Sequence, residues 1–152
     1  MKTIISMMTL IMFLSFSSAN AQEQAGKSTP ANVKAAFAKL YPNVKNATWR
    51  MEEKAYEAKF TENGKEISVH FNKNGDYLEK EYYMKVSELP QPAQDYLTKH
   101  YAGVKITEAS KIETAKGVTL YEAETKDKDI MFDDKGNFTK EVKEAPGEEP
   151  EK

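Results

Sequence analysis

The sequence predicts an α+β protein built as a tandem repeat, in which one helix is followed by a meander of antiparallel strands. Three observations support this prediction. The chain aligns with itself at an offset of about 60 residues, each copy opens with apolar residues at helical spacing, and alternating apolar and polar residues follow.

The internal repeat spans the central part of the chain. Residues 29–45 align with residues 89–105, so that Pro30 meets Pro90 and Tyr41 meets Tyr101. Further on, Tyr-Glu-Ala recurs at 56–58 and 121–123, and residues 71–77 align with residues 132–138. The offset changes in polar, turn-like segments, where insertions are tolerated. We therefore expect repeat one at 29–86 and repeat two at 87–143.

The ends of the chain differ in composition from this centre. Residues 1–21 combine a positive start, an apolar run at 4–16 and the small residues Ala19 and Ala21, which together predict a Sec signal cleaved after Ala21. The run is shorter than the roughly 20 residues that span a bilayer. We expect a periplasmic or secreted protein that leaves the membrane after cleavage. Residues 22–28 are predicted to be a flexible lead, and residues 144–152 a disordered acidic tail.

Each repeat should begin with a helix. Pro30 and Pro90 suit a first helical turn, where a missing N–H is tolerated. Pro42-Asn43 and Ala102-Gly103 should end the two helices. One apolar stripe is expected on each helix, at Val33, Ala36, Phe37 and Leu40 and at Ala93, Tyr96 and Leu97.

Strands are expected where apolar and polar residues alternate. The alternation predicts half-buried antiparallel strands, apolar on one face and polar on the other. Their apolar residues are Ala47, Trp49 and Met51, then Tyr56, Ala58 and Phe60, then Ile67, Val69 and Phe71. Residues 62–65 predict a tight hairpin, and residues 72–75 and 133–136 predict type I turns with a glycine bulge. In residues 77–84 either phase places aromatic rings on one side, so the facing of that strand stays open.

Composition excludes several functional classes. The 152 residues include 22 Lys and Arg, 24 Asp and Glu, and no cysteine. Mixed, nearly balanced charge argues against nucleic-acid binding, which needs a concentrated basic face. Without cysteine there are no disulfides, thiolate metal sites or cysteine nucleophiles.

The repeated motifs resemble those of a known family. Pro-x-x-Val/Ala-x-x-x-Phe/Leu, Tyr-Pro-Asn-Val with Trp49 soon after, Tyr-Glu-Ala and Phe-Asn/Asp-x-x-Gly occur in this order. They are similar to the PepSY-like, β-lactamase-inhibitor-like secreted proteins of Bacteroidetes. The resemblance implies a fold like the β-lactamase inhibitory protein, with both units joined into one curved antiparallel sheet and the helices on one face. That inhibitor carries disulfides, so none of its contact residues is carried over to this cysteine-free chain.

No catalytic or cofactor motif is present in the sequence. His70 and His100 lack a second ligand at metal spacing, and structural roles are favoured for both. Ser68, Ser87 and Ser110 have no base arranged beside them. We expect a protein that is not an enzyme and needs no cofactor.

A weak metal candidate is the densest acidic cluster, which consists of Asp127, Asp129, Asp133 and Asp134. Calcium takes such oxygen ligands, but the spacing lacks the alternation of an EF-hand loop. Two solvated hairpin turns are the favoured interpretation.

Surface aromatic and basic residues suggest a binding face. Tyr82 and Tyr83 place one ring on each side of their strand, so one should be exposed, with Arg50, Lys59 and His70 as neighbours on the polar face. This pattern predicts a face for a protein or peptide partner in the envelope, with enzyme inhibition as one form of that role. An ordinary solvated face is an equal alternative, and binding of a small ligand or calcium is the second functional hypothesis. A monomer or weak dimer is expected.

Overall fold

The computed structural model describes residues 29–52 and 54–143. The predicted signal, flexible lead and acidic tail lie outside the described residues. The chain runs through α1 (Ala31–Leu40), β1 (Thr48–Glu52), β2 (Ala55–Glu62), β3 (Lys65–Phe71), β4 (Tyr77–Tyr83), the 3₁₀ turn η1 (Val86–Glu88), α2 (Gln91–His100), β5 (Glu108–Thr114), β6 (Thr119–Glu124), β7 (Lys128–Phe132) and β8 (Phe138–Lys143).

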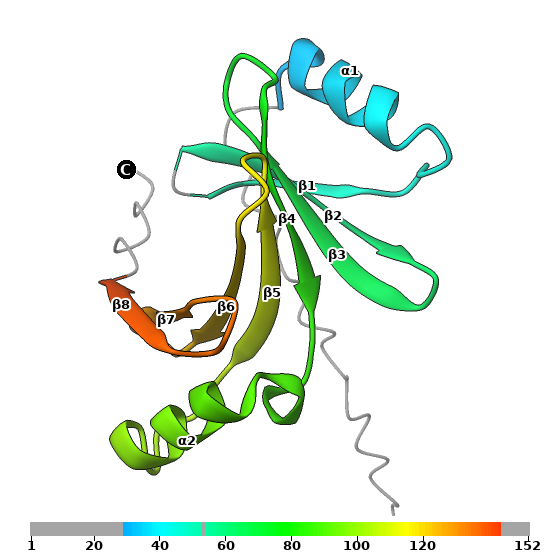
Figure 1. Ribbon diagram of the computed structural model, residues 1–152. Coiled ribbons are helices and arrows are strands. Elements are labelled where there is room, and N and C mark those ends of the chain that lie inside the picture. Colours follow the sequence, from blue (N-terminus) through cyan, green and yellow to red (C-terminus); the bar gives the residue numbers. More distant parts are fainter. Residues whose placement is uncertain (1–28, 53, 144–152) are drawn as a thin grey trace, which may run out of the picture.

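The eight strands form one antiparallel sheet in chain order, β1 to β8. Figure 1 shows the sheet strongly twisted, with α1 and α2 at opposite ends of the view. The β4–β5 ladder, from Glu79 opposite Thr114 to Tyr83 opposite Ser110, joins the first four strands to the last four. The predicted α+β class is confirmed, with one antiparallel sheet and two helices.

Both helices start directly after a proline. Pro30 and Pro90 stand one residue before the first helical turn, and their carbonyls accept hydrogen bonds from the backbone N–H groups of Lys34 and Gln94 at 3.1 and 3.2 Å. Each helix ends at a tyrosine whose N–H donates back into the last turn. None of the described helices is long and apolar enough to cross a membrane.

The first half of the chain packs α1 on β1–β4. Val33 and Phe37 are buried against Tyr56, Phe60, Val69 and other strand residues. Leu40 is 53% exposed, so the predicted stripe is wrong there; the ring of Tyr41 stacks on Phe37 at the helix end instead. Met51 is also exposed, at 50%, because β1 is an edge strand of the sheet.

The second half packs α2 on β5–β8. Leu89, Ala93 and Leu97 are buried against Ala109, Ala123, Ile130 and Phe132. Both cores lie on the same face of the sheet, because paired residues point to the same side. The pairs that connect the cores are Ile67 with Tyr82, Tyr82 with Lys111, Lys111 with Tyr121, and Tyr121 with Phe132.

The predicted turns are confirmed. Asn63 and Gly64 have φ of 52° and 76° in a two-residue hairpin between β2 and β3. Gly75 and Gly136 donate back across their turns to Asn72 and Asp133, and each turn follows a register shift in the preceding strand. At Gly136 a Cβ atom would stand 2.6 Å from the Cβ of Pro90, so this turn contacts the start of α2.

The polar face of the strands differs from the prediction. The strands were expected to be half-buried, yet Glu57 and Ser68 are 0% exposed and His70 is 5% exposed. Strand β3 is therefore buried on both sides from Ile67 to Phe71. The register also fixes the facing of β4, with Lys80 and Tyr82 toward the helices and Glu79, Glu81 and Tyr83 on the opposite side.

Candidate functional site

The sheet face opposite α1 and α2, called here the helix-free face, gathers polar side chains from both halves of the chain. Register places on it Arg50, Glu57, Lys59, Glu66, Ser68, His70, Glu79, Glu81, Tyr83, Glu108, Ser110, Glu122, Glu124, Asp129 and Lys140. No helix of the described residues packs on this face. Its side chains therefore pack mainly against one another and against Ile112, Leu120 and Met131, which the register places on the same face.

Glu57 is the centre of the first network. It lies opposite Arg50 in the β1–β2 ladder, and its carboxylate accepts hydrogen bonds from Arg50 Nε, Ser68 Oγ and Tyr83 Oη. The Ser68 and Tyr83 hydroxyls are also 2.9 Å apart. Burial alone would raise the pKa of Glu57, but the hydrogen bonds and the charge of Arg50 outweigh it and lower that pKa. Glu57 is thus a stable buried carboxylate.

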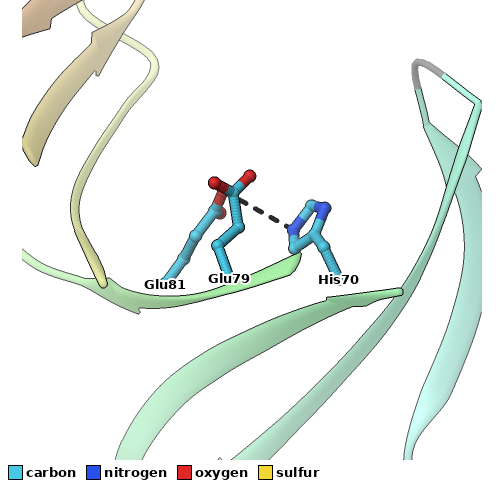
Figure 2. Close-up of side chains that lie close together, drawn as sticks. All are labelled: His70, Glu79 and Glu81. Atoms are coloured by element: carbon cyan, nitrogen blue, oxygen red, sulfur yellow. Dashed lines mark ion pairs between the residues drawn. The ribbon is translucent and has the colours of Figure 1, made fainter. Parts of the chain in front are cut away.

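His70 is the centre of the second network, shown in Figure 2 with Glu79 and Glu81. His70 Nε2 lies 3.5 Å from Glu81 Oε1, and Glu79 is the cross-strand neighbour of His70. We call these three residues the His70 cluster. Burial lowers the pKa of His70, but the carboxylates of Glu81, Glu57 and Glu79 outweigh burial and raise it. His70 Nε2 is buried and has no hydrogen-bond partner.

Glu122 is the centre of the third network, in the second half. It lies opposite Ser110, whose hydroxyl donates to it at 3.2 Å. Burial and the nearby carboxylates of Glu81, Asp129 and Glu124 raise the pKa of Glu122 to about 8. Near neutral pH this side chain is largely a neutral acid, in contrast to Glu57.

The helix-free face as a whole is acidic. Its carboxylates are Glu57, Glu66, Glu79, Glu81, Glu108, Glu124 and Asp129, against Arg50, Lys59, His70 and Lys140, with Glu122 largely protonated near neutral pH. The overall composition does not reveal this negative charge, because acidic and basic residues are nearly equal in number over the whole chain. A cationic group approaching this face meets complementary charge.

Four of the five predicted partner-binding residues meet on this face. Lys59 lies over the Tyr83 ring at 4.1 Å and pairs with Glu66 at 3.4 Å and Glu108 at 3.9 Å. Arg50 and His70 stand nearby in the same ladder of strands. Tyr82 is on the opposite face, where its hydroxyl donates to Glu113 at 3.2 Å.

The prediction that either Tyr82 or Tyr83 has an exposed ring is wrong. Both rings are half-buried, because Tyr82 packs against the first core and Tyr83 lies beneath Lys59. Burial also raises the pKa of Tyr83 far above its ordinary range.

The predicted acidic cluster is dispersed. Asp133 Oδ1 accepts the backbone N–H groups of Lys135 and Asn137 and so caps its own turn, and Asp127 and Asp134 are exposed. Asp129 lies on the helix-free face. Among the described residues, the group found able to hold a metal ion is His70, Glu79 and Glu81, which includes none of these aspartates.

The remaining candidates lie away from the helix-free face. His100 is exposed at the end of α2, with its ring stacked 4.4 Å from Tyr96. Two surface hollows have volumes of about 380 and 410 Å³. The first is lined by residues 117–120 and 133–134, and the second by residues 43–46 and 60–63. Each is therefore formed within one half of the chain and not between the halves.

Sequence reasoning missed the carboxylates of this face, above all Glu57, Glu79, Glu81 and Glu122. A signal was present for two of them, since Glu57 and Glu122 are the central residues of the repeated Tyr-Glu-Ala triplets. No such signal marks Glu79 and Glu81, because the facing of their strand depends on its register with β3.

Comparison with known families gives one match over most of the chain. The family model described as "Putative beta-lactamase-inhibitor-like, PepSY-like" matches residues 25–75 and again residues 54–140. No curated protein sequence matches.

Solved structures from Bacteroides share the fold at low sequence identity. A structure described as "putative periplasmic proteins" from Bacteroides eggerthii has a TM-score of 0.62 and 17% identity, over 77% of this chain and 90% of that one. A DUF2874 family protein from Bacteroides uniformis has a TM-score of 0.61 and 21% identity, over 75% and 88%. A BLIP-like protein from Bacteroides fragilis has a TM-score of 0.55 and 20% identity, over 84% and 94%.

Proposed function

Because the chain belongs to the PepSY-like, beta-lactamase-inhibitor-like family, we propose that it is an exported binding protein whose helix-free face holds a protein or peptide partner. The observation that carries this proposal is the face itself, a broad surface that no described helix covers and on which polar side chains outnumber apolar ones such as Ile112, Leu120 and Met131. Export is supported by the signal-like residues 1–21 and by the periplasmic description of one structural neighbour.

The charge of the face defines the partner's chemistry. Carboxylates from six strands, β2 to β7, outnumber the basic groups. Charge complementarity speeds association and rejects wrong partners. The partner therefore offers a segment rich in Lys or Arg, which lies across the strands near Glu79, Glu108 and Glu124.

Lys59 and Tyr83 provide the anchoring contact on this face. The Lys59 ammonium lies over the Tyr83 ring, and the tyrosine hydroxyl is fixed by Ser68 and Glu57. Tyrosine and basic side chains held in this way present contact area at low conformational cost. They form a preorganised neutral-to-basic spot within an otherwise acidic face.

The proposed role is non-enzymatic and inhibitor-like. Two buried hydroxyls touch carboxyl groups, Ser68 at Glu57 and Ser110 at Glu122. The lowered pKa of Glu57 makes it a poor general base, and Glu122 is largely protonated near neutral pH and so is not available as a base there. The BLIP-like description of one neighbour favours occlusion of an extracytoplasmic enzyme as the form that binding takes.

The helix-free face extends over both halves of the chain, which we propose are a tandem repeat. A helix precedes four consecutive strands in both halves of the chain. We infer that residues 29–86 and 87–143 are two copies of one unit, joined through β4 and β5 so that their polar faces are continuous.

The test first captures the partner by cross-linking and then measures its affinity for variants of the protein. Protein expressed from Gln22 carries a photo-crosslinking residue in place of Lys59, on the helix-free face, or in place of the exposed Lys34 on α1 as the matched control. The protein cross-linked from an envelope extract through position 59, and not through position 34, is identified by mass spectrometry and purified.

The purified partner is then titrated against two charge-reversed variants. Glu108→Lys with Glu124→Lys changes the helix-free face, and Asp95→Lys with Asp134→Lys makes the same charge change at exposed positions elsewhere. We expect at least a tenfold loss of affinity for the first variant and less than a twofold loss for the second. Equal effects of both variants, or no cross-link specific to position 59, would exclude the proposed face.

A further inference from the structure

The His70 cluster brings three metal-binding side chains to one point of the helix-free face. One imidazole nitrogen and one oxygen of each carboxylate, from His70, Glu79 and Glu81, all lie within 4.8 Å of one another. His70 is on β3, and both glutamates are on the adjacent strand β4, two residues apart and so on the same side. Paired strands of a continuous sheet hold these groups in place.

The state of the His70 ring is a separate indication of a ligand. The residue is only 5% exposed, and its Nε2 atom is buried without a hydrogen-bond partner. Figure 2 shows the ring turned toward the two carboxylates. A buried polar atom without a hydrogen bond is costly. An ion between the ring and the carboxylates would satisfy that atom.

We propose that His70, Glu79 and Glu81 bind one divalent transition-metal ion, with zinc as the best fit. This proposal is independent of the proposed partner-binding function. Zinc accepts imidazole nitrogen together with carboxylate oxygen, whereas calcium takes six to eight oxygen ligands. Two carboxylates also balance the charge of a divalent ion.

The distances suit zinc coordination. Zinc ligands at about 2.0–2.2 Å place neighbouring donor atoms about 3.4 Å apart in a tetrahedral site. His70 Nε2 and Glu81 Oε1 are already 3.5 Å apart. An oxygen of the half-buried Glu79 lies within 4.8 Å of a ring nitrogen of His70 and of an oxygen of Glu81.

Three protein donors leave one tetrahedral position for water. Glu57 is the next carboxylate across the ladder from His70, but Arg50, Ser68 and Tyr83 already occupy its oxygens.

Isothermal titration of chelator-treated protein, expressed from Gln22, tests the site with zinc chloride. We expect one equivalent of zinc to bind with micromolar or tighter affinity, and calcium chloride to bind at least tenfold more weakly. Zinc should also raise the melting temperature in proportion to the logarithm of its concentration. Nitrogen-detected NMR of the two imidazoles should shift the Nε2 resonance of His70 and leave His100 unchanged.

Matched variants separate this site from incidental binding. His70→Gln and Glu79→Gln should each weaken zinc binding at least tenfold, while His100→Gln and Glu66→Gln should change it less than twofold. If His70→Gln fails to fold, the half-buried Glu79→Gln answers the same question. Absence of zinc binding in the wild type, or retention of its affinity in Glu79→Gln, would overturn the proposal.

Discussion

Glu57 and Glu122 are the central residues of the two Tyr-Glu-Ala triplets, and their surroundings give them opposite charge states. Glu57 faces Arg50, whereas Glu122 faces Ser110. The cation and its hydrogen bonds lower the pKa of Glu57, and burial among carboxylates raises that of Glu122 to about 8. A cation beside one carboxyl and three further carboxylates beside the other thus account for the opposite shifts.

The Arg50–Glu57 pair gives the first prediction. Arg50→Gln leaves a fully buried carboxylate with its hydroxyl donors but without its cation, and we expect a loss of about 2 kcal/mol in the free energy of unfolding, measured by urea denaturation. The half-exposed position of Arg50 keeps this loss below that of a fully buried pair. Arg50→Gln combined with Glu57→Gln should recover most of it, and Lys39→Gln on α1 is the surface control. A double variant as unstable as the single one would contradict this account.

Glu122 gives a prediction on pH. The pKa of the Glu122 carboxyl is about 8 in the folded protein, against an ordinary value of 4.5. Between these two pH values the folded protein therefore holds a proton that the unfolded chain has lost. Its contribution to stability is therefore greatest below about pH 4.5 and falls as pH rises toward 8. Glu122→Gln stays neutral and keeps an acceptor for Ser110. Between about pH 5 and pH 8.5 we expect the free energy of unfolding of the variant to rise, relative to that of the wild type, by on the order of 3 kcal/mol.

This pH prediction is checked by urea denaturation in chelator at each pH. The groups facing Glu122 are Ser110 on β5, Glu124 on β6, Asp129 on β7 and Glu81 on β4. Glu66→Gln, an exposed glutamate of the same face, controls for the loss of a carboxylate. A difference between Glu122→Gln and wild type that does not change with pH would show that Glu122 is charged throughout.

At the scale of elements, alternation in sequence predicts strands well but does not predict what covers them. Tyr56, Ala58 and Phe60 are buried as expected, yet Glu57 between them is buried as completely. Alternation encodes the polarity of each face, whereas burial depends on side chains from neighbouring strands. The prediction that Leu40 belongs to the buried stripe is wrong for a related reason. Apolar residues at helical spacing do not show that the Tyr41 ring packs against Phe37 in place of Leu40.

The candidate site was only partly predictable for the same reason. Arg50, Lys59 and His70 were grouped by the phase of their strands, which the register confirms as one face, whereas the choice between Tyr82 and Tyr83 was left open. Glu79 and Glu81 could not be added, because the bulge between His70 and Phe71 sets which side of β4 they occupy. A bulge shifts the pairing by one residue and so reverses facing.

The turn before β8 gives a prediction at this scale. Gly136 has φ of 82°, and an added Cβ would stand 2.6 Å from Pro90 Cβ and 3.2 Å from the backbone nitrogen of Ala93. Gly64 has a similar φ of 76° with nothing within 4 Å. Both Gly→Ala variants carry the strain of positive φ, about 1 kcal/mol. Gly136→Ala must also push α2 away from the sheet, at a further cost of about 1–3 kcal/mol.

Thermal and urea unfolding of both variants measures that difference. We expect Gly136→Ala to be the less stable of the two, with Gly64→Ala close to wild type apart from its backbone strain. Equal stabilities would mean that the turn and the start of α2 separate freely, and would remove the contact that positions α2.

At the scale of the whole molecule, one sheet connects two cores that do not share a buried residue. The first core contains Phe37 and Phe71, and the second contains Leu97 and Phe132. The β4–β5 ladder links them, and the side chains of β4 serve both halves, since Glu81 is near His70 on one side and raises the pKa of Glu122 on the other. Units of this size are marginal alone, because too little surface is buried on folding. We therefore expect both halves to unfold together.

Trp49 makes this expectation measurable, since it is the only tryptophan of the chain and contacts Phe37 in the first core at 5.3 Å between ring centroids. Leu97→Ala removes a side chain that is 5% exposed in the second core, and should cost about 2–5 kcal/mol. If the sheet unfolds as one unit, the Trp49 fluorescence transition and the far-ultraviolet circular dichroism transition fall by the same amount in this variant. Leu40→Ala, at an exposed position of α1, should leave both transitions within about 0.5 kcal/mol of wild type. A Trp49 transition that stays in place while circular dichroism shows an earlier step would mean that the halves fold independently, and the continuous helix-free face would then depend on two separately stable units.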